Sequence, residues 1–318
     1  MAIAITPFEG LCGFRPLGEV THYLKEVKPF RDLVGEDVAA AFFEAVSGHE
    51  TDDDPAFVER NKIALKNAFS SLMSASRPAL ESATASLLAS VSADPTGFAG
   101  GGVDATSSDI ISELIKRLYG EFGVDYGIFN LFFLNYVTLE PGEALFLQAD
   151  DIHAYISGDI VECMASSDNV VRAGFTPKFK DVPTLTSMLT YNYAPIDQQK
   201  MHPVDYPYVA LNRAAYSSGS ECILYDPPIQ EFSVLRTSLK SQGSRVTFEP
   251  LAGPTVAICT GGKGRISVGS KVAIFSEGNV FFVGATAEAI LEASSLEEDE
   301  AFVVFLAFCE MEDHSNGN

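Results

Sequence analysis

The feature that most constrains the fold is the order in which two hydrophobic periodicities follow one another. Residues 1–15 have β-strand character and end in the turn Gly13-Phe14-Arg15-Pro16. Residues 17–122 repeat apolar side chains at the three- to four-residue spacing of helices, and strand patterns return after Gly127. Strands on both sides of a long helical stretch predict an α+β protein in which a helical domain is inserted into a β-domain.

The helical stretch contains one sharply defined element. Residues 110–122 follow three residues that can cap a helix N-terminus, and a loop rich in Gly and Pro (94–102) precedes them. Their apolar face is expected to consist of Ile111, Leu114, Ile115 and Leu118. The Ala-rich runs 38–46 and 79–93 also favour helices, and the capping candidates are Ser107, Ser108 and Asp109.

The remainder of the chain reads as β-structure in two parts. A strand is expected at Phe129–Leu139, and short strands continue to about Phe175. Residues 183–228 read as an irregular connector. Gly261-Gly-Lys-Gly264 is interpreted as a hairpin turn and not as a phosphate-binding loop. Seven short strands predict a second, antiparallel β-sandwich or small barrel: Phe232–Leu239, Arg245–Phe248, Thr255–Thr260, Arg265–Val268, Lys271–Phe275, Val280–Gly284 and Ala301–Phe308.

These patterns divide the chain into six segments. The expected division is a remnant strand of the first β-domain (1–15), an inserted helical domain (16–125), the remainder of the first β-domain (126–195), a connector (196–230), a second β-domain (231–312) and a tail (313–318). The third segment includes the polar stretch 153–178, which carries the candidate site.

Composition excludes several classes of function. A formal net charge of −22 argues against binding to nucleic acid or to an anionic membrane, but it permits an anionic small substrate held by a few local cations. No apolar run reaches the roughly 18 residues of a membrane span, and the start of the chain lacks a signal peptide. The five cysteines are widely spaced and without CxxC pairs, which indicates buried, reduced thiols in a cytoplasmic protein.

Polar chemistry is concentrated between His153 and Lys178, where charged residues alternate with β-formers and tight turns. His153 suits a metal ion, although a histidine beside two aspartates is often only a hydrogen-bonded structural residue. Tyr155, two residues further on, shares its strand face and could hydrogen-bond a ligand.

Two further residues of this ribbon leave alternatives open. Arg172 could bind a phosphate, with Lys178 nearby, or could pair structurally with Asp168 or Glu162. Glu162, in an apolar strand, could pair with Arg172 or could serve as a proton-transfer group with a raised pKa.

The ribbon His153–Lys178, with residues 4–16 and 225–229, resembles the signature of the type I phosphomannose isomerases, zinc-dependent cupin enzymes. The resemblance implies two cupin-type β-sandwich or barrel domains with a helical domain inserted in the first. It also implies the interconversion of mannose 6-phosphate and fructose 6-phosphate through a cis-enediol, which supplies mannose for GDP-mannose and glycosylation. His153 then corresponds to a Zn²⁺ ligand, Arg172 and Glu162 to catalytic residues, and Tyr155, Asp168 and Lys178 to substrate-binding residues. The family form is expected to be a monomer.

The same resemblance places the family's other three zinc ligands before the segment that matches Met1. The first cupin is therefore expected to be N-terminally incomplete, and this chain by itself to hold zinc weakly, to be inactive and to be poorly soluble. The alternative is a non-catalytic cupin paralogue that binds a sugar phosphate or a protein partner.

Overall fold

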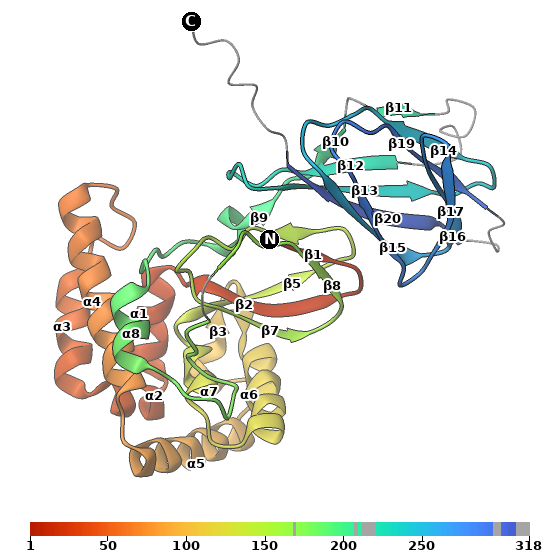
Figure 1. Ribbon diagram of the computed structural model, residues 1–318. Helices are drawn as coiled ribbons and strands as arrows, with labels where there is room; N and C mark the ends of the chain where they lie inside the picture. The colour runs from red at the N-terminus through yellow and green to blue at the C-terminus, as the bar shows by residue number, and fades with distance from the viewer. Residues whose placement is uncertain (168–169, 207–208, 212–220, 295–299, 310–318) are drawn as a thin grey trace, which may run out of the picture.

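The computed structural model describes residues 1–167, 170–206, 209–211, 221–294 and 300–309. Figure 1 shows a block of helices, a central β-domain and a C-terminal β-sandwich, with the central β-domain between the other two. Within the described part of the chain, no helix has the combination of length and apolar character needed to cross a bilayer.

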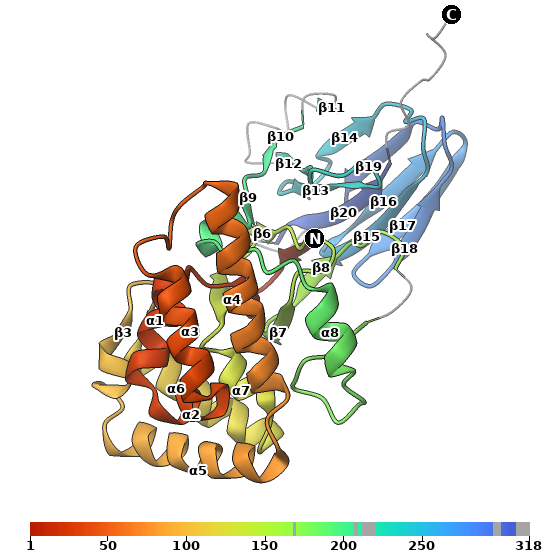
Figure 2. The same ribbon diagram turned by 90° about the vertical axis from the view of Figure 1, so that its left-hand side faces the viewer.

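The helical block is formed by the residues for which the sequence predicts helices. Figure 2 shows α5 lying across one end of this block. The predicted apolar face of α6 is confirmed, because its four residues are all buried. Ser107 occupies the N-cap position of α6, but its side chain makes no capping hydrogen bond. The helices are α1 Leu17–Glu26, α2 Lys28–Val34, α3 Glu36–Val46, α4 Pro55–Met73, α5 Arg77–Ala93 and α6 Ser108–Phe122; between α5 and α6 lie η1 Phe98–Gly101, β3 Gly102–Val103 and β4 Thr106–Ser107.

The expected strand Phe129–Leu139 is correct only in its second half. A short helix, α7, occupies Tyr126–Asn130, and strand β5 runs from Leu134 to Leu139. The cause is a local cap: the Asp125 carboxylate accepts a hydrogen bond from the amide of Gly127 at 2.7 Å. The cap gives the first backbone amides of the helix a hydrogen-bond acceptor. This stabilisation of the helix outweighs the preference of the aromatic residues that follow for a strand.

The central β-domain consists of two facing sheets. The three-stranded sheet has the order β5-β2-β7, with β2 at Phe8–Phe14 and β7 at His153–Ser157. The four-stranded sheet has the order β8-β1-β6-β9, with the bounds Ile160–Glu162, Ala2–Ala4, Ala144–Leu145 and Lys200–Met201. A small core lies between the sheets, formed by Ala4, Phe8, Cys12, Val137, Leu139 and Leu145. The expectation of strands as far as Phe175 is wrong, because residues 163–167 and 170–181 contain none.

The helical block leaves and rejoins the three-stranded sheet at adjacent points. Arg15, directly after β2, donates its backbone amide to Phe133 O at 2.8 Å, just before β5 begins. Its guanidinium Nε donates to Leu131 O at 3.1 Å, and Nη1 lies 2.9 Å from a carboxylate oxygen of Glu19. The Arg15 residue is only 1% exposed. A buried guanidinium is tolerated here because a carboxylate and a carbonyl receive its protons.

Asn135 closes the same junction from the β5 side. Its Nδ2 donates to the carbonyl oxygens of Cys12 at 3.3 Å, Phe14 at 3.1 Å and Ala194 at 3.0 Å. The register between β2 and β5 shifts between Cys12 and Phe14, so this amide supplies hydrogen bonds where the strand ladder is interrupted.

The C-terminal β-sandwich packs a six-stranded sheet against a five-stranded sheet. The orders are β10-β12-β13-β20-β15-β18 and β11-β14-β19-β16-β17. The seven predicted strands are confirmed within two residues at each end, whereas β12 and β19 were not predicted. The bounds are β12 Glu221–Tyr225, β13 Ser233–Leu239, β14 Arg245–Phe248, β15 Thr255–Gly261, β16 Lys263–Val268, β17 Lys271–Ser276, β18 Val280–Val283, β19 Ala289–Ala293 and β20 Phe302–Phe308.

The glycine-rich segment 261–264 does not form a hairpin turn. Strand β15 pairs with β18 and β20 in one sheet, while β16 pairs with β17 and β19 in the other. Gly262, at φ +69°, therefore carries the chain from one sheet to the opposite one. A Cβ at this position would lie 2.4 Å from Ala301 O, so the corner requires glycine.

The stretch 183–228, expected to be irregular, is more regular than predicted. It overlaps α8 Val182–Met188 and contains η2 Ile196–Gln198, β9, β10 Val204–Asp205, β11 Val209–Leu211 and β12. Strand β9 joins the central β-domain, whereas β10 and β11 join the two sheets of the C-terminal sandwich. The connector therefore belongs to both β-domains.

The two β-domains meet along an apolar seam. Ile3 and Ala144 of the central domain are buried in one cluster with Val234 and Phe305 of the six-stranded sheet. The hydroxyl of Tyr225 donates to Gly142 O across this seam at 2.8 Å. The shared core indicates that the two domains are packed together and not simply linked.

The five cysteines are all free thiols, as the sequence predicts. Cys12, Cys222 and Cys259 are buried, whereas Cys163 and Cys309 are half-buried. The prediction that the thiols are buried is therefore correct for three of the five.

We expect Asn135→Ala to destabilise the protein by about 2–3 kcal/mol, because the carbonyls of Cys12, Phe14 and Ala194 lose the hydrogen bonds from its side-chain amide and a cavity is left. Equilibrium unfolding in denaturant measures this loss. The matched control is Asn192→Ala, since Asn192 is exposed and its side chain accepts a hydrogen bond from Lys62 at the surface. Equal stability of the two variants would contradict the role assigned to Asn135.

Candidate functional site

His153 lies on β7, directly opposite Cys12 of β2. The side chain is exposed, and its Nδ1 lies 3.0 Å from the backbone oxygen of Asp151. A carbonyl oxygen only accepts, so Nδ1 carries the proton of the neutral ring and Nε2 keeps its lone pair. This is the arrangement in which a histidine offers Nε2 to a ligand.

Tyr155 and Glu162 form the second part of the site. The rings of His153 and Tyr155 have their centroids 5.7 Å apart, which confirms that they share a strand face. The phenol of Tyr155 donates to Glu162 Oε1 at 2.6 Å. Because β7 and β8 belong to different sheets, this hydrogen bond spans the two sheets of the central domain.

The turn between β7 and β8 permits this crossing. Gly158 has φ +98°, and a Cβ there would lie 2.4 Å from Pro7 O. Asp159 donates its amide to the hydroxyl of Thr6 at 2.8 Å. The turn at Gly158 and Asp159 therefore directs Glu162 back toward Tyr155.

The protonation state of Tyr155 follows from its surroundings. Burial raises the pKa of the phenol, and the hydrogen bond and negative charge of Glu162 raise it further. The hydroxyl therefore remains protonated at neutral pH and is a permanent donor to the Glu162 carboxylate. Among the described residues no other side chain donates to Glu162, so its second oxygen can accept a hydrogen bond from a third group.

Arg172 and Lys178 lie outside this cluster of contacts. Arg172 is half-buried, and its Nη1 donates to Val170 O at 3.3 Å. Among the ion pairs of the described residues none joins Arg172 to Glu162, so that alternative is not realised. Asp168, the other expected partner, lies outside the described residues. Lys178 is exposed, and its amide donates to the Thr176 hydroxyl at 3.2 Å.

The other described histidines have separate surroundings. His22 Nε2 lies 2.7 Å from Ala99 O, and His49 pairs with Asp52 at 2.6 Å while stacking on Phe57. His202 is exposed. In the part of the chain that the structure describes, His22 and His49 take their partners from outside the ribbon. His314 lies outside the described residues.

A polar cavity of about 290 Å³ opens between the central β-domain and the connector. It includes Asp151, two residues before His153, and Gln199, whose Oε1 accepts a hydrogen bond from the Cys12 thiol at 2.5 Å. Burial raises the pKa of this thiol to about 12. The other lining residues are Phe146, Gln148, Gln198, Lys200, Met201, His202, Asp226 and Pro228.

Sequence reasoning noted Asp151 only as a residue beside His153, and it missed Gln199. Asp151 has a visible signal, since it precedes His153 by two residues. Gln199 has none, because only the pairing of β9 with β6 brings it near Cys12.

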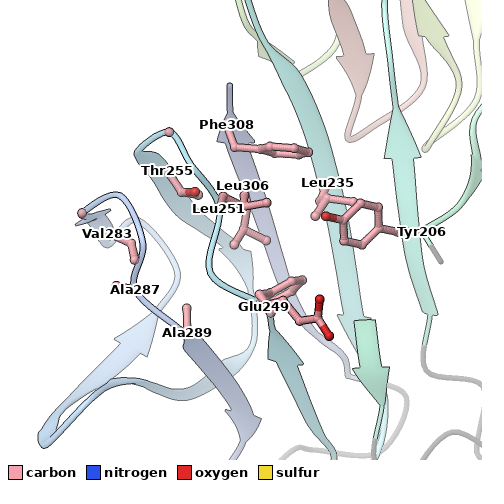
Figure 3. A pocket seen from close by; sticks show the side chains of 13 residues that line it. Tyr206, Leu235, Glu249, Leu251, Thr255, Val283, Ala287, Ala289, Leu306 and Phe308 are labelled. Carbon is pink, nitrogen blue, oxygen red and sulfur yellow. The ribbon is translucent and has the colours of Figure 1, made fainter. Parts of the chain in front are cut away.

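A second hollow, in the C-terminal sandwich, is shown in Figure 3. Its labelled side chains are mainly apolar, among them Leu235, Leu306 and Phe308, with the Glu249 carboxylate at one side. The free space is about 20 Å³, which is room for one water molecule. It is a packing gap of the sandwich core and too small for a sugar phosphate.

The described residues do not by themselves fit a zinc ion. A protein zinc site needs at least three ligands. No group of three or more His, Cys, Asp or Glu side chains in the described part of the chain is placed to hold a metal. His153 has the chemistry of one ligand, and its neighbours do not complete a set.

Comparison with known proteins relates this architecture to one family. Residues 33–134, which include most of the helical block, match the family model for the helical insertion domain of type I phosphomannose isomerase. Residues 222–271 match the model for the C-terminal domain of the same enzymes.

The full chain also matches curated relatives. It is 56% identical to the mannose-6-phosphate isomerase of Emericella nidulans over 100% of this chain and 71% of the relative. It is 42% identical to that of Saccharomyces cerevisiae over 98% of this chain and 68% of the relative. The protein therefore belongs to the type I mannose-6-phosphate isomerase family.

Solved structures show the same fold. A mannose 6-phosphate isomerase from Salmonella typhimurium, bound to its substrate and to zinc, superposes with a TM-score of 0.70 at 22% identity. A point mutant of the phosphomannose isomerase from the same organism superposes with a TM-score of 0.72 at 21% identity. In both comparisons 98% of this chain is covered, and the chain spans 66% of the solved structure, slightly less than two thirds. The predicted fold class, cupin-type β-domains with a helical insertion, is confirmed.

We expect Glu162→Gln to lower the pKa of Tyr155 while leaving it above its ordinary value of about 10, because burial is the larger cause of the shift. The raised pKa stabilises the fold below pH ~10, and this contribution is lost as the pH rises through the folded-state pKa. NMR titration of ring-labelled tyrosine measures the change. Tyr136, which bonds Glu9 instead, is the internal control and should not move.

Proposed function

We propose that this chain carries part of the active site of a mannose-6-phosphate isomerase, which interconverts mannose 6-phosphate and fructose 6-phosphate. The observation that carries the proposal is the cluster of His153, Tyr155 and Glu162 between two sheets, in a chain 56% identical over its full length to such an enzyme. The substrate and zinc bound to the Salmonella typhimurium relative support the same reaction.

The reaction moves two protons within the open-chain sugar. A base removes the proton from C2 of the aldose, and a cis-enediol forms as the C1 oxygen gains a proton. Returning a proton to C1 while the C2 hydroxyl loses its own gives the ketose. An aldose–ketose isomerisation of this kind needs no net oxidant and no nucleotide.

Glu162 is proposed as the group that takes part in this proton transfer. One of its oxygens accepts the Tyr155 hydroxyl, and this bond orients the carboxylate. A protonated phenol and a carboxylate together can hold a sugar hydroxyl and exchange a proton with it. Tyr155 is therefore proposed as a substrate-binding residue that also positions Glu162.

Arg172 and Lys178 are proposed to bind the charged end of the substrate, and Asp168 a sugar hydroxyl. A guanidinium offers several donors in a plane and suits phosphate oxygens. None of the ion pairs among the described residues involves Arg172. In a chain of net charge −22, two local cations on one ribbon favour an anionic ligand at that place.

Two observations support zinc as the metal of this site: a relative that binds zinc, and the position of His153. The zinc-bound relative supports Zn²⁺ as the family's metal, and His153 is proposed as one ligand. Because the described residues do not complete a ligand set, we propose that residues 1–318 alone hold zinc weakly and turn over slowly or not at all. The first cupin-type domain is then incomplete without further ligands. We further propose a monomeric, cytoplasmic protein.

The first experiment measures zinc content and isomerase activity of residues 1–318, beside the longer product if the gene encodes upstream residues. Activity and stoichiometric zinc only in the longer product would support the proposal. Turnover with stoichiometric zinc in residues 1–318 alone would contradict the proposed ligand set. Inactivity of both forms would favour a non-catalytic cupin protein that binds a sugar phosphate or a partner.

In whichever form is active, Arg172→Ala should lower kcat/KM at least about 100-fold, because a charge-assisted contact to phosphate is lost. Arg245→Ala is the matched control, since Arg245 is an exposed arginine of the C-terminal sandwich. Steady-state kinetics with mannose 6-phosphate give both values. A loss of similar size in the two variants would mean that Arg172 has no special role.

A further inference from the structure

The segment 170–181 carries Arg172 and Lys178 but contains no helix or strand. It is nevertheless attached to the helical block by alternate residues. Val171, Ala173 and Phe175 pack against the helical core, and the Phe175 ring lies 4.9 Å from that of Phe122 in α6. The backbone of the segment is therefore held by the helical block, and Arg172 lies between two of its anchored residues.

A hydrogen bond also attaches this segment to Asp125. The carboxylate, in a residue 9% exposed, accepts the Phe175 amide on Oδ1 at 2.8 Å. The same oxygen accepts the amide of Gly127 at 2.7 Å. One buried oxygen thus joins the start of α7 to the turn at Phe175. Hydrogen bonds to a charged, buried acceptor are among the stronger ones in a protein.

A lysine closes the turn from the other side. Lys180 Nζ lies 3.8 Å from Asp125 Oδ2 and donates to Thr176 O at 2.8 Å. Both oxygens of Asp125 are therefore directed toward the segment. Lys178 lies between the two residues that this interaction fixes, Thr176 and Lys180.

The backbone at this point adopts a conformation that needs such support. Phe175 has φ +54°, a left-handed conformation that is unfavourable for a bulky aromatic residue. A Cβ on Gly174 would lie 2.7 Å from Asp125 Oδ1, and a Cβ on Gly127 would lie 2.6 Å from the Phe175 ring. Strained backbone of this kind persists where the surroundings over-determine it, and it is concentrated at functional sites.

We propose that Asp125 is a positioning residue of the site: through the Phe175 amide and Lys180 it fixes the backbone that presents Arg172 and Lys178 to the phosphate of the substrate. The inference rests on the proposed isomerase function. It gives the helical insertion a part in substrate binding, although Asp125 itself need not touch the substrate. A fixed backbone matters here because long cationic side chains lose less entropy on binding when their attachment points are already ordered.

The test compares four variants in the active form of the protein. Asp125→Ala removes the acceptor, and Gly174→Ala blocks the same contact from the segment. Asp125→Asn keeps an oxygen that can accept both amides. Asp54→Ala is the matched control, because Asp54 caps α4 by accepting the amide of Ala56 at 2.9 Å, far along the chain from the ribbon.

Two quantities are measured for each variant. Hydrogen exchange reports whether the Phe175 amide and residues 170–181 are protected. Kinetics with mannose 6-phosphate separate KM from kcat. We expect Asp125→Ala and Gly174→Ala to speed exchange of the segment and to raise KM about tenfold with a smaller change in kcat, because binding of the non-reacting phosphate is weakened. Asp125→Asn should recover most of both, and Asp54→Ala should change neither.

Unchanged exchange of the segment in Asp125→Ala would overturn the proposal, and so would faster exchange with an unchanged KM. Loss of protection throughout the helical block in that variant would shift the decision to Gly174→Ala, which leaves the Asp125 carboxylate itself unchanged. A wild-type protein that neither binds nor converts mannose 6-phosphate would overturn the isomerase assignment, whereas the exchange data would still decide whether Asp125 holds the segment.

Discussion

The structure depends on the hydrogen bonds that join the two ends of the helical block beside the end of strand β2. The backbone of Arg15 bonds Phe133, and Asn135 bonds carbonyls on both sides of the β2 irregularity. These contacts hold β5 beside β2, and β2 in turn pairs with β7. Because His153 stands opposite Cys12 in that last pairing, the position of the candidate site is set by a junction on the far side of the same strand. The buried Arg15 is stable in this place only because its guanidinium is directed at acceptors.

The elements that the sequence predicts well are those whose pattern is local. Helix α6 shows its buried face in the spacing of its apolar residues, and the strands of the C-terminal sandwich are bounded by turn residues. Helix α7 was missed because one capping carboxylate outweighs the strand preference of several aromatic residues. The corner at Gly262 was misread because a tight turn has the same composition whether the chain stays in one sheet or changes sheets.

In the candidate site, too, some features can be predicted from the sequence and others cannot. The shared face of His153 and Tyr155 follows from the two-residue period of a strand, and the sequence predicts it. The bond between Tyr155 and Glu162 does not follow, because it requires β7 and β8 to belong to opposite sheets. The attachment of Phe175 to Asp125 joins residues 50 positions apart in the chain, and no periodicity carries information about such a pair. Periodicity gives the direction of a side chain, whereas its partner is decided by the tertiary fold.

The way the helical block is attached has a consequence for where the chain can accept insertions and deletions. The two ends of the helical block are hydrogen-bonded to each other, so for the β-sheets the block is a closed loop. Its length does not change the distance between those ends. The entropy of closing a loop rises only with the logarithm of its length, so added turns at the distant end near α5 would cost the β-sheets little. Insertions and deletions there are therefore compatible with an unchanged register between β2 and β7. The same change placed within Arg15–Leu17 or Leu131–Asn135 would shift the sheet itself.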